Sequence, residues 1–598
     1  MEDAKAVTSR SRARKTRPRK RKFHGNRFTQ LKAQKVNEDV DASTSRSSGI
    51  VEPEVGVELE VKSASFLKLG ENVGLDLDSG DERETRSTSQ GVDSEGYRLF
   101  QKLQIVSCLQ NLACPVCLLT PDKGDPFHIE EKLVGISSTI IVRCKGCGEK
   151  VTELSQTENV NLRFQAALYG IGCHMTKGRR LLAALDMPPP VTVTRSSIFR
   201  DRIRLATETI AKESMERAAD ELRKVEGDNV TVSCDGSWQR RGFSSKNGLA
   251  TCLTVSKKVP AKVIDTEVLT NYCDGCSKIK ARKTGKDLEN GMENHAKDCR
   301  KNYSGSAGGM EPAGMVKIFR RSEELYGMRY TGYLGDGDSK SFRTVAEADP
   351  PVYKDVGIQK LECCGHVQKR MGKRLLDKIN QCKGKVYQHG NKKVKGIGGA
   401  GKLTKAAVKR IQGHYGGAIR NNIGSLDKMK TAIWAIWHHR NGDHDKCSGF
   451  SWCDKSDKNK LPSFVMEEIK SVFEDLSADT LLGKCLHGGT QNANESYHHL
   501  VWDRCPKAVF VGRDRLEIAV FDATIVYNEG GSGRLDVFRK LGLSVGRFQK
   551  QGFRDLDLRR VKSAENQKKT VTKQKRARKT IRNAEEDFGD DDYEAGAF

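Results

Sequence analysis

The sequence has no long apolar run, no internal repeat and fewer acidic than basic residues. No stretch of about 18 apolar residues occurs anywhere in its 598 residues, which argues against a membrane-spanning helix. The basic start is not followed by an apolar segment, so we expect no secretory signal. These absences predict an intracellular protein without a membrane partner.

The excess of basic over acidic residues gives the chain a strong positive charge. It has 104 Lys plus Arg against 78 Asp plus Glu, which leaves a formal net charge of +26. Lysine and arginine neutralise phosphates and release counterions, so this balance indicates a polyanionic partner, and nucleic acid fits it best. The length suggests roughly three to five structural units.

Cysteine is abundant, with 18 residues. In an intracellular protein these are expected to be reduced thiols and metal ligands. Two C-x2-C pairs are separated by β-rich sequence, a spacing that lets two turns place four thiolates around Zn²⁺. We expect a structural zinc site there, with a coincidental grouping as the alternative; its ligands are Cys114, Cys117, Cys144 and Cys147.

Two further groups have metal-ligand spacing. A C-x2-C pair followed by H-x3-C predicts a second zinc site in a lysine-rich stretch, against the alternative of unrelated thiols in a solvated loop. A third group has irregular spacing, and Trp452 beside it favours simple packing as much as a metal. The second set is Cys273, Cys276, His295 and Cys299, and the third is His438 or His439 with His444, Cys447 and Cys453.

Three β-rich runs lie close together in the middle of the chain. They are Asn229–Cys234, Gly248–Val259 and Lys262–Leu269, and their composition is typical of strands. Strand patterns recur at Met328–Leu334 and Ile358–Glu362, with helical patterns between them. The sequence therefore predicts an α/β fold with a mixed sheet.

Helical patterns flank this sheet on both sides. We expect one helix over Asn161–Leu185 and a second that ends near Val225. Three more, at Leu403–Ile423, Lys428–Trp437 and Ser463–Leu476, predict a helical insertion. The first 95 residues and the basic-then-acidic C-terminal tail show little periodicity, so we expect disorder there.

Three acids stand out by their setting. Asp235 and Asp336 each end a predicted strand, and Glu495 lies in a predicted helix. A hard cation such as Mg²⁺ takes a few carboxylates and completes its shell with phosphate oxygens, and a pair of such ions serves in-line phosphoryl transfer. Any one of the three could instead be a helix cap or a surface residue.

Several motifs together resemble those of the Mutator-like element transposases, in particular the animal group. These motifs are Lys20-Arg-Lys-Phe-His-Gly-Asn-Arg27, Cys234-Asp-Gly-Ser-Trp238, Gly335-Asp-Gly-Asp-Ser339, Glu362-Cys-Cys-Gly-His-Val-Gln-Lys369, Ser451-Trp-Cys453 and Asn494-Glu-Ser496.

The resemblance implies a ribonuclease-H-like core with a DDE triad that is interrupted by a helical insertion. Asp235, Asp336 and Glu495 match the triad, with Asp338 as a rival for the second position, and His366 belongs to a C/D-x2-H signature that starts at Cys363. It also implies Mg²⁺ or Mn²⁺ as cofactor, double-stranded DNA as substrate and a homo-oligomer. The basic run at 10–22 is typical of a nuclear-localisation signal.

These expectations divide the chain into seven segments. The implied activity is metal-dependent cleavage and strand transfer at terminal inverted repeats; the alternatives are a domesticated, non-catalytic DNA-binding regulator and a structure-selective nuclease. The segments are a basic arm (1–95), a zinc-ribbon-like module (96–155), a helical DNA-binding or oligomerisation segment (156–226), the first part of the core (227–380) with a zinc insertion (271–305), the helical insertion (381–489), the last part of the core (490–560) and the tail (561–598).

Overall fold

The computed structural model describes most of the chain from residue 62 to residue 569. The described ranges are 62–73, 97–120, 126–156, 158–240, 244–337, 340–447, 449–450, 452–453 and 460–569, with positions 572, 576 and 579. The basic run at 10–22, the motif at 20–27, Asp338, Ser451 and most of the C-terminal tail lie outside them. Among the described helices none is both long enough and apolar enough to cross a membrane.

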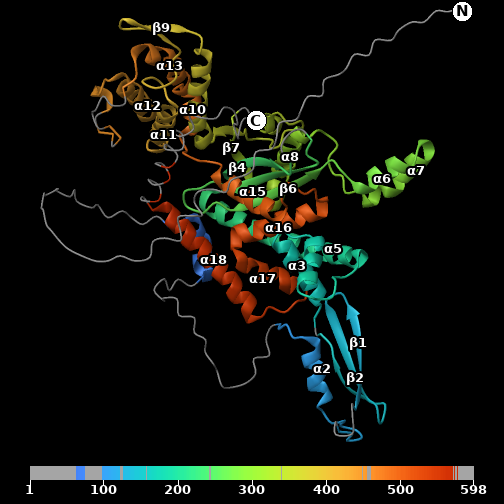
Figure 1. Cartoon of the computed structure of the whole chain (residues 1–598). Coiled ribbons are helices and arrows are strands. Elements are labelled where there is room, and N and C mark those ends of the chain that lie inside the picture. The colour runs from blue at the N-terminus through green and yellow to red at the C-terminus, as the bar shows by residue number, and fades with distance from the viewer. Residues whose placement is uncertain are drawn as a thin grey trace, which may run out of the picture. The chain divides into compact units, whose positions relative to one another are not determined.

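A five-stranded mixed sheet lies at the centre of the fold (Figure 1). Its order is β6-β5-β4-β7-β8; β4, β5 and β6 are antiparallel, while β7 runs parallel to β4 and β8 parallel to β7. The predicted mixed α/β sheet is thus confirmed. Its strands are β4 (Asn229–Trp238), β5 (Asn247–Thr254), β6 (Val263–Thr270), β7 (Arg329–Gly335) and β8 (Gln359–Glu362).

Helices cover both faces of this sheet because strand side chains alternate between the two faces. On β5, Ala250 and Cys252 pack towards α8 (Met310–Tyr326), whereas Leu249 and Leu253 pack towards α15 (Asn492–Arg504) and α16 (Arg513–Glu529). All eight residues of β5 are buried. The short helix α9 (Lys340–Ala346) follows β7 and packs on α8.

The segment before the sheet is helical, but its first part is broken. The single helix expected over 161–185 is wrong: α3 (Val160–Gly170) and α4 (Met175–Ala184) are separate. Gly172 has φ +72°, and a Cβ there would lie 2.4 Å from the Asp503 carbonyl oxygen. Close packing against the end of α15 therefore breaks the helix. The helices α5 (Val193–Glu226) and α17 (Arg534–Lys540) pack with α3 and α16 in one hydrophobic core.

An antiparallel three-stranded sheet precedes these helices. It consists of β1 (Phe127–Val134), β2 (Ser137–Cys144) and β3 (Lys150–Leu154), preceded by α2 (Lys102–Gln110). Its small core contains Phe127, Ile140 and Val142. With so few buried apolar side chains, a unit of this size needs another source of stability.

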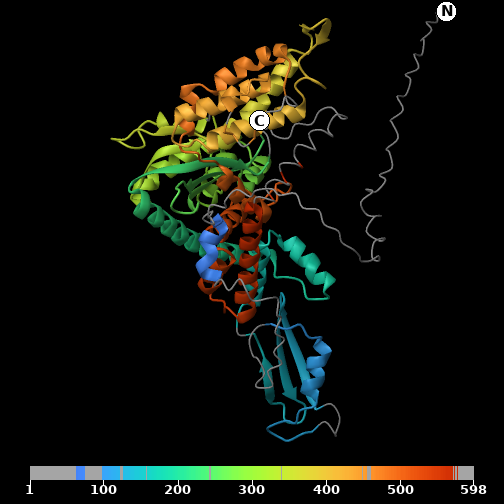
Figure 2. The ribbon, with the colours of Figure 1, turned by 90° about the vertical axis from the view of Figure 1, so that its left-hand side faces the viewer.

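The helical insertion forms a core of its own. Its helices are α11 (Lys405–Arg420), α12 (Leu426–Asn441), α13 (Ser463–Leu476) and the short α14 (Asp479–Leu482). They pack together with α10 (Cys364–Gln381), which precedes the predicted insertion (Figures 1 and 2). The insertion is not purely helical, since β9 (Val386–His389) and β10 (Lys392–Lys395) form an unexpected hairpin.

Four further helices of the described residues are α6 (Asp274–Arg282), α7 (Gly285–His295), α18 (Arg547–Lys568) and α1 (Ala64–Val73). Helices α6 and α7 follow β6. Helix α18 extends past the predicted end of the core at residue 560 and packs against α1 through Leu69 and Val561. Helix α1 is an exception to the disorder expected before residue 95.

Candidate active site and metal centres

Helix α15 lies along β4 in register with its side chains. Two residues of a strand advance by about 6.6 Å and four residues of a helix by about 6 Å, so every fourth residue of α15 meets every second residue of β4. Asn494 bonds Ser233, with the Ser233 hydroxyl donating over 2.5 Å, and the Trp502 indole N–H donates to Ser237 at 2.8 Å. Between these pairs, His498 Nδ1 lies 3.5 Å from Asp235 Oδ2.

The start of α15 is fixed by two further hydrogen bonds. The Gln491 side-chain amide donates to the Cys234 carbonyl oxygen at 2.8 Å, and its backbone N–H donates to Cys363 Sγ at 3.3 Å. Cys363 precedes α10 and is buried, and its own N–H donates to the Gly335 carbonyl at the end of β7. The helix that carries Glu495 is thereby tied to both strands that carry the other two acids.

Asp235 lies within β4, which corrects the expectation that it ends a strand. The strand continues to Trp238 because 235–238 pair with β5, Asp235 itself with Thr251. The parallel register aligns Ser233 with Leu334, so Asp235 and Asp336 follow side by side two residues later. Burial and the nearby Glu311 carboxylate raise the pKa of Asp235 to about 8, whereas burial lowers the pKa of His498 to about 3.

His366 lies between the other two acids. It occupies the first turn of α10, with Nδ1 3.1 Å from Asp336 Oδ1 and Nε2 3.8 Å from Glu495 Oε1. The Asp336 carboxylate raises the pKa of His366, and His366 in turn holds the pKa of Asp336 well below its ordinary value. Lys369 Nζ lies 3.9 Å from Glu495 Oε1. The side chains of Asp336 and Glu495 are 66% and 55% exposed, so a large substrate can reach them.

Glu311 is a fourth carboxylate that the sequence interpretation missed. It lies in the first turn of α8 and accepts a 2.7 Å hydrogen bond from the Ser341 hydroxyl. It packs so closely on β4 that a Cβ added at Gly236 would lie 2.4 Å from its Oε2. The sequence signal is weak: Glu311 stands two residues after Ala307-Gly-Gly309, and Gly236 directly follows Asp235.

The carboxylate oxygens of Asp235, Asp336 and Glu495, which we call the carboxylate edge, fit a hard cation that also takes ligands from phosphate. Carboxylate oxygens of Asp235, Asp336 and Glu495 are the type that Mg²⁺ or Mn²⁺ prefers. They are spread out: among the described residues, the groups of metal donors that lie within 4.8 Å of one another are all Cys/His sets. The edge is therefore an open site that its substrate would complete.

The first Cys/His set joins two similar turns of the small three-stranded unit. Cys114 Sγ lies 3.8 Å from Cys147 Sγ, and Cys117 Sγ lies 3.5 Å from Cys144 Sγ. In the two C-x2-C turns, the backbone N–H groups of Leu118 and Gly148 donate 2.9 Å hydrogen bonds to the carbonyl oxygens of Cys114 and Cys144. Leu118 and Gly148 both have positive φ. All four donors lie within 4.8 Å, so the set could hold Zn²⁺ tetrahedrally.

The second set joins α6 and α7. Cys273 and Cys276 lie at the start of α6, and His295 ends α7. Cys273 Sγ lies 3.2 Å from His295 Nε2, and Cys276 Sγ lies 3.4 Å from Cys299 Sγ. These four donors also lie within 4.8 Å of one another, so they too could hold a metal ion.

The third set lies at the end of α12, and it includes His439 and not His438. His438 Nδ1 instead lies 2.8 Å from Asp443 Oδ2. His439 faces His444, Cys447 and Cys453, and the four donors lie within 4.8 Å. The Trp452 ring packs edge-on against His439, so packing and metal donors occur together here.

Open carboxylates beside the central strands of the sheet, in a chain this basic, are the features of a protein that handles nucleic-acid phosphates. The model of a protein family described as Mutator-like transposase matches residues 96–453, more than half of the chain. The chain therefore belongs to the Mutator-like transposase family, which confirms the resemblance and indicates a DNA-acting enzyme. Asp235, Asp336 and His366 lie inside the matched region and Glu495 lies beyond it. No curated protein matches the chain.

Proposed function

We propose that this chain is a DDE-type DNA transposase with a ribonuclease-H-like core. It binds the inverted repeats of an element and catalyses metal-dependent cleavage and strand transfer. The observation that carries the proposal is the convergence of Asp235, Asp336 and Glu495 from β4, the end of β7 and α15. The mixed sheet order and the helical insertion that precedes Glu495 support the core assignment.

In this proposal Asp235, Asp336 and Glu495 hold Mg²⁺ or Mn²⁺. The bound ions would activate the attacking oxygen and stabilise the leaving oxygen. His498 and Gln491 keep α15 on β4, so that Glu495 is held at a fixed distance from Asp235. His366 has a raised pKa and lies at the exposed mouth of the site, where it can contact the scissile phosphate.

The three Cys/His sets would hold structural Zn²⁺. Four protein donors leave no open position for a substrate, so their role is to stabilise the units that carry them. The small three-stranded unit, with its small core, depends on such a site most.

The experiment that tests the proposal is DNA cleavage and joining by the full-length protein in Mg²⁺ or Mn²⁺, on DNA that carries the repeats flanking the gene. We expect Glu495→Gln to lower both activities by at least about 100-fold, because a lost metal ligand removes several kcal/mol of transition-state stabilisation. The control is Glu324→Gln on the exposed side of α8.

The outcomes separate the alternatives. Equal activity in wild type and Glu495→Gln would refute the triad. A wild type that binds the repeats without cutting them would indicate a domesticated regulator, and one that cuts without joining would indicate a nuclease.

A further inference from the structure

The hairpin of β9 and β10 carries an unusual concentration of one charge. Between Cys382 and Lys405 the chain has seven lysines and no acidic residue. Five of the seven lie in the hairpin or directly beside it, and all five are exposed. These five, which we call the hairpin lysines, are Lys383, Lys385, Lys392, Lys393 and Lys395.

The strand register sorts the hairpin into two faces. Tyr387 pairs with Val394, and both pack against the core of the helical insertion. Because neighbouring residues of a strand point to opposite faces, Gln388 with Lys393 and Val386 with Lys395 lie on the other face. The Val386 side chain is 62% exposed there, so this face is turned to solvent.

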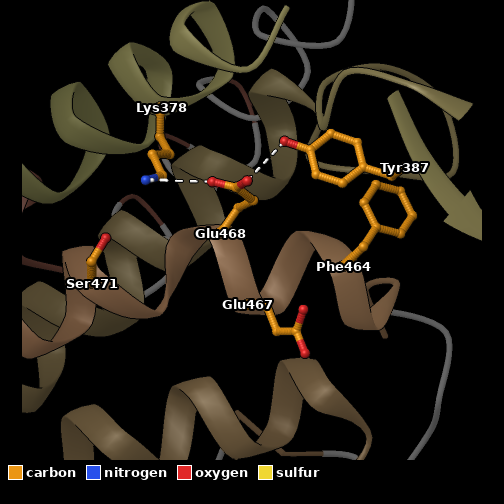
Figure 3. Close-up of a pocket in the computed structure, with 6 residues that line it drawn as sticks. All are labelled: Lys378, Tyr387, Phe464, Glu467, Glu468 and Ser471. Atoms are coloured by element: carbon orange, nitrogen blue, oxygen red, sulfur yellow. Dashed lines mark hydrogen bonds and ion pairs between the residues drawn. The ribbon is translucent and has the colours of Figure 1, made fainter. Parts of the chain in front are cut away.

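The inner face is firmly anchored (Figure 3). The Tyr387 ring stacks on Phe464 with ring centroids 5.0 Å apart, and its hydroxyl donates to Glu468 Oε1 at 2.9 Å. Glu468 also accepts from Lys385 at 3.1 Å and lies 3.5 Å from Lys378 Nζ. The hairpin is thus fixed to α13, and Figures 1 and 2 show it extending away from the helices.

Most charges of the hairpin lysines are not neutralised by the protein itself. Lys393 and Lys395 lie on the outer face, and Lys392 is exposed at the turn, where it pairs with His389. Lys385 is paired with Glu468, but within the part of the chain that the structure describes, Lys383, Lys392, Lys393 and Lys395 have no acidic group within ion-pair distance. Four like charges on a rigid support repel one another, and a polyanion relieves that repulsion. The fixed geometry also reduces the entropy that binding would lose.

We propose that the outer face and the turn of this hairpin, with Lys392, Lys393 and Lys395, bind the phosphate backbone of double-stranded DNA. A two-stranded ribbon fits the major groove, and lysines along its exposed face can neutralise the phosphates beside it. The contact is independent of base sequence and orients the duplex on the helical insertion. The inference rests on the proposed DNA-acting function but not on catalysis, because the hairpin shares no residue with the carboxylate site.

The test measures DNA binding by the full-length protein, without divalent metal, to a random-sequence duplex over a range of salt concentrations. The variant is the triple substitution Lys392→Gln, Lys393→Gln and Lys395→Gln. Since each phosphate contact contributes about 0.9 to the slope of log affinity against log salt, we expect the slope to fall by about two to three and the affinity by about 100-fold near physiological salt.

The matched control removes the same charge elsewhere. Lys224→Gln, Lys257→Gln and Lys258→Gln change three exposed lysines at the end of α5 and in the β5–β6 turn. An equal loss in both variants would show a general charge effect and overturn the proposal, as would unchanged DNA binding and an unchanged salt slope in the hairpin variant. If the wild type fails to cleave repeat DNA while the hairpin variant still lowers the salt slope, the catalytic proposal fails and this one stands.

Discussion

The Cys/His sets and the carboxylate edge differ in how the chain builds them. Each Cys/His set comes from one short stretch of sequence and brings four donors within 4.8 Å. The acids come from β4, the end of β7 and α15, which lie far apart along the chain. The first arrangement could hold an ion with four protein donors, whereas the second leaves room for a substrate.

The difference extends to charge. At the carboxylate edge, His366 and Lys369 lie beside Asp336 and Glu495 and offset their charge. In the first Cys/His set the four donors are all cysteines, so a dipositive ion is the natural partner of their thiolates. The comparison suggests that losing a Cys ligand should damage structure, while losing an acid should damage activity.

The largest structural effect is expected at Cys117. Cys117→Ser removes a donor from the first set, and the small core of β1, β2 and β3 cannot replace it. Apparent zinc-binding free energies are about 10–16 kcal/mol in zinc-finger peptides, so we expect the unit to unfold locally. Hydrogen exchange should show loss of protection in β1–β3 together with the loss of one zinc ion per chain.

The control for this prediction is Cys108→Ser, an exposed cysteine outside the set. Unchanged zinc content and unchanged protection in Cys117→Ser would show that the four thiols are only neighbours. Protection of the five-stranded sheet should stay the same in both variants, because its core is separate from that of the small unit.

A smaller effect, on the pKa of His366 and on stability, is expected when the pair of Asp336 and His366 is broken. The pKa of His366 is raised and that of Asp336 is lowered. The pair therefore stabilises the fold in the pH range above the ordinary pKa of Asp and below that of His, and this contribution is lost as pH falls through the Asp336 pKa or rises through that of His366. Asp336→Asn should lower the His366 pKa, which NMR titration of the imidazole measures.

Mg²⁺ should lower the His366 pKa in the wild type in the same direction, since a cation on Asp336 removes the attraction. The carboxylate variant Asp336→Glu is the control, because it keeps the charge. A His366 pKa that responds neither to Asp336→Asn nor to Mg²⁺ would contradict the placement of His366 between the acids.

The sequence predicted the parts of both sites that depend on local order. The C-x2-C and H-x3-C spacings were visible because their ligands lie within a few turns of one another. The strands that carry or precede Asp235 and Asp336 were visible from their β-rich composition, although β4 extends three residues past Asp235. The helical break at Gly172 was not, because it depends on a contact with Asp503 far along the chain.

The residues that position the acids could not be predicted for the same reason. Gln491 and His498 act through contacts with β4 and β5 that only the folded sheet creates. The hairpin was missed because Val386-Tyr-Gln-His389 and Lys392-Lys-Val-Lys395 lack the apolar alternation of a strand and are held from outside by Phe464 and Glu468. Long-range contacts, which local spacing does not record, decided each of these cases.

The smallest expected effect is a change in the pH dependence of stability when Glu311 is replaced. The pKa of Asp235 is raised to about 8 by burial and by Glu311. When an acid has a higher pKa in the folded than in the unfolded state, the protein loses stability as pH rises between these two pKa values, here between about 4 and 8. Glu311→Gln should remove the repulsion and also the raised pKa of Glu311 itself, so metal-free protein should lose less stability over this range.

The measurement is the unfolding midpoint of wild type, Glu311→Gln and Glu324→Gln across this pH range, with and without Mg²⁺. The exposed Glu324→Gln should follow the wild type. Mg²⁺ should raise the midpoint of the wild type most at the alkaline end, where Asp235 has lost its proton, because cation and proton compete for the same carboxylate. Identical pH profiles for wild type and Glu311→Gln would show that Glu311 does not act on Asp235. Only Asp235, Asp336 and Glu495 would then belong to the carboxylate edge.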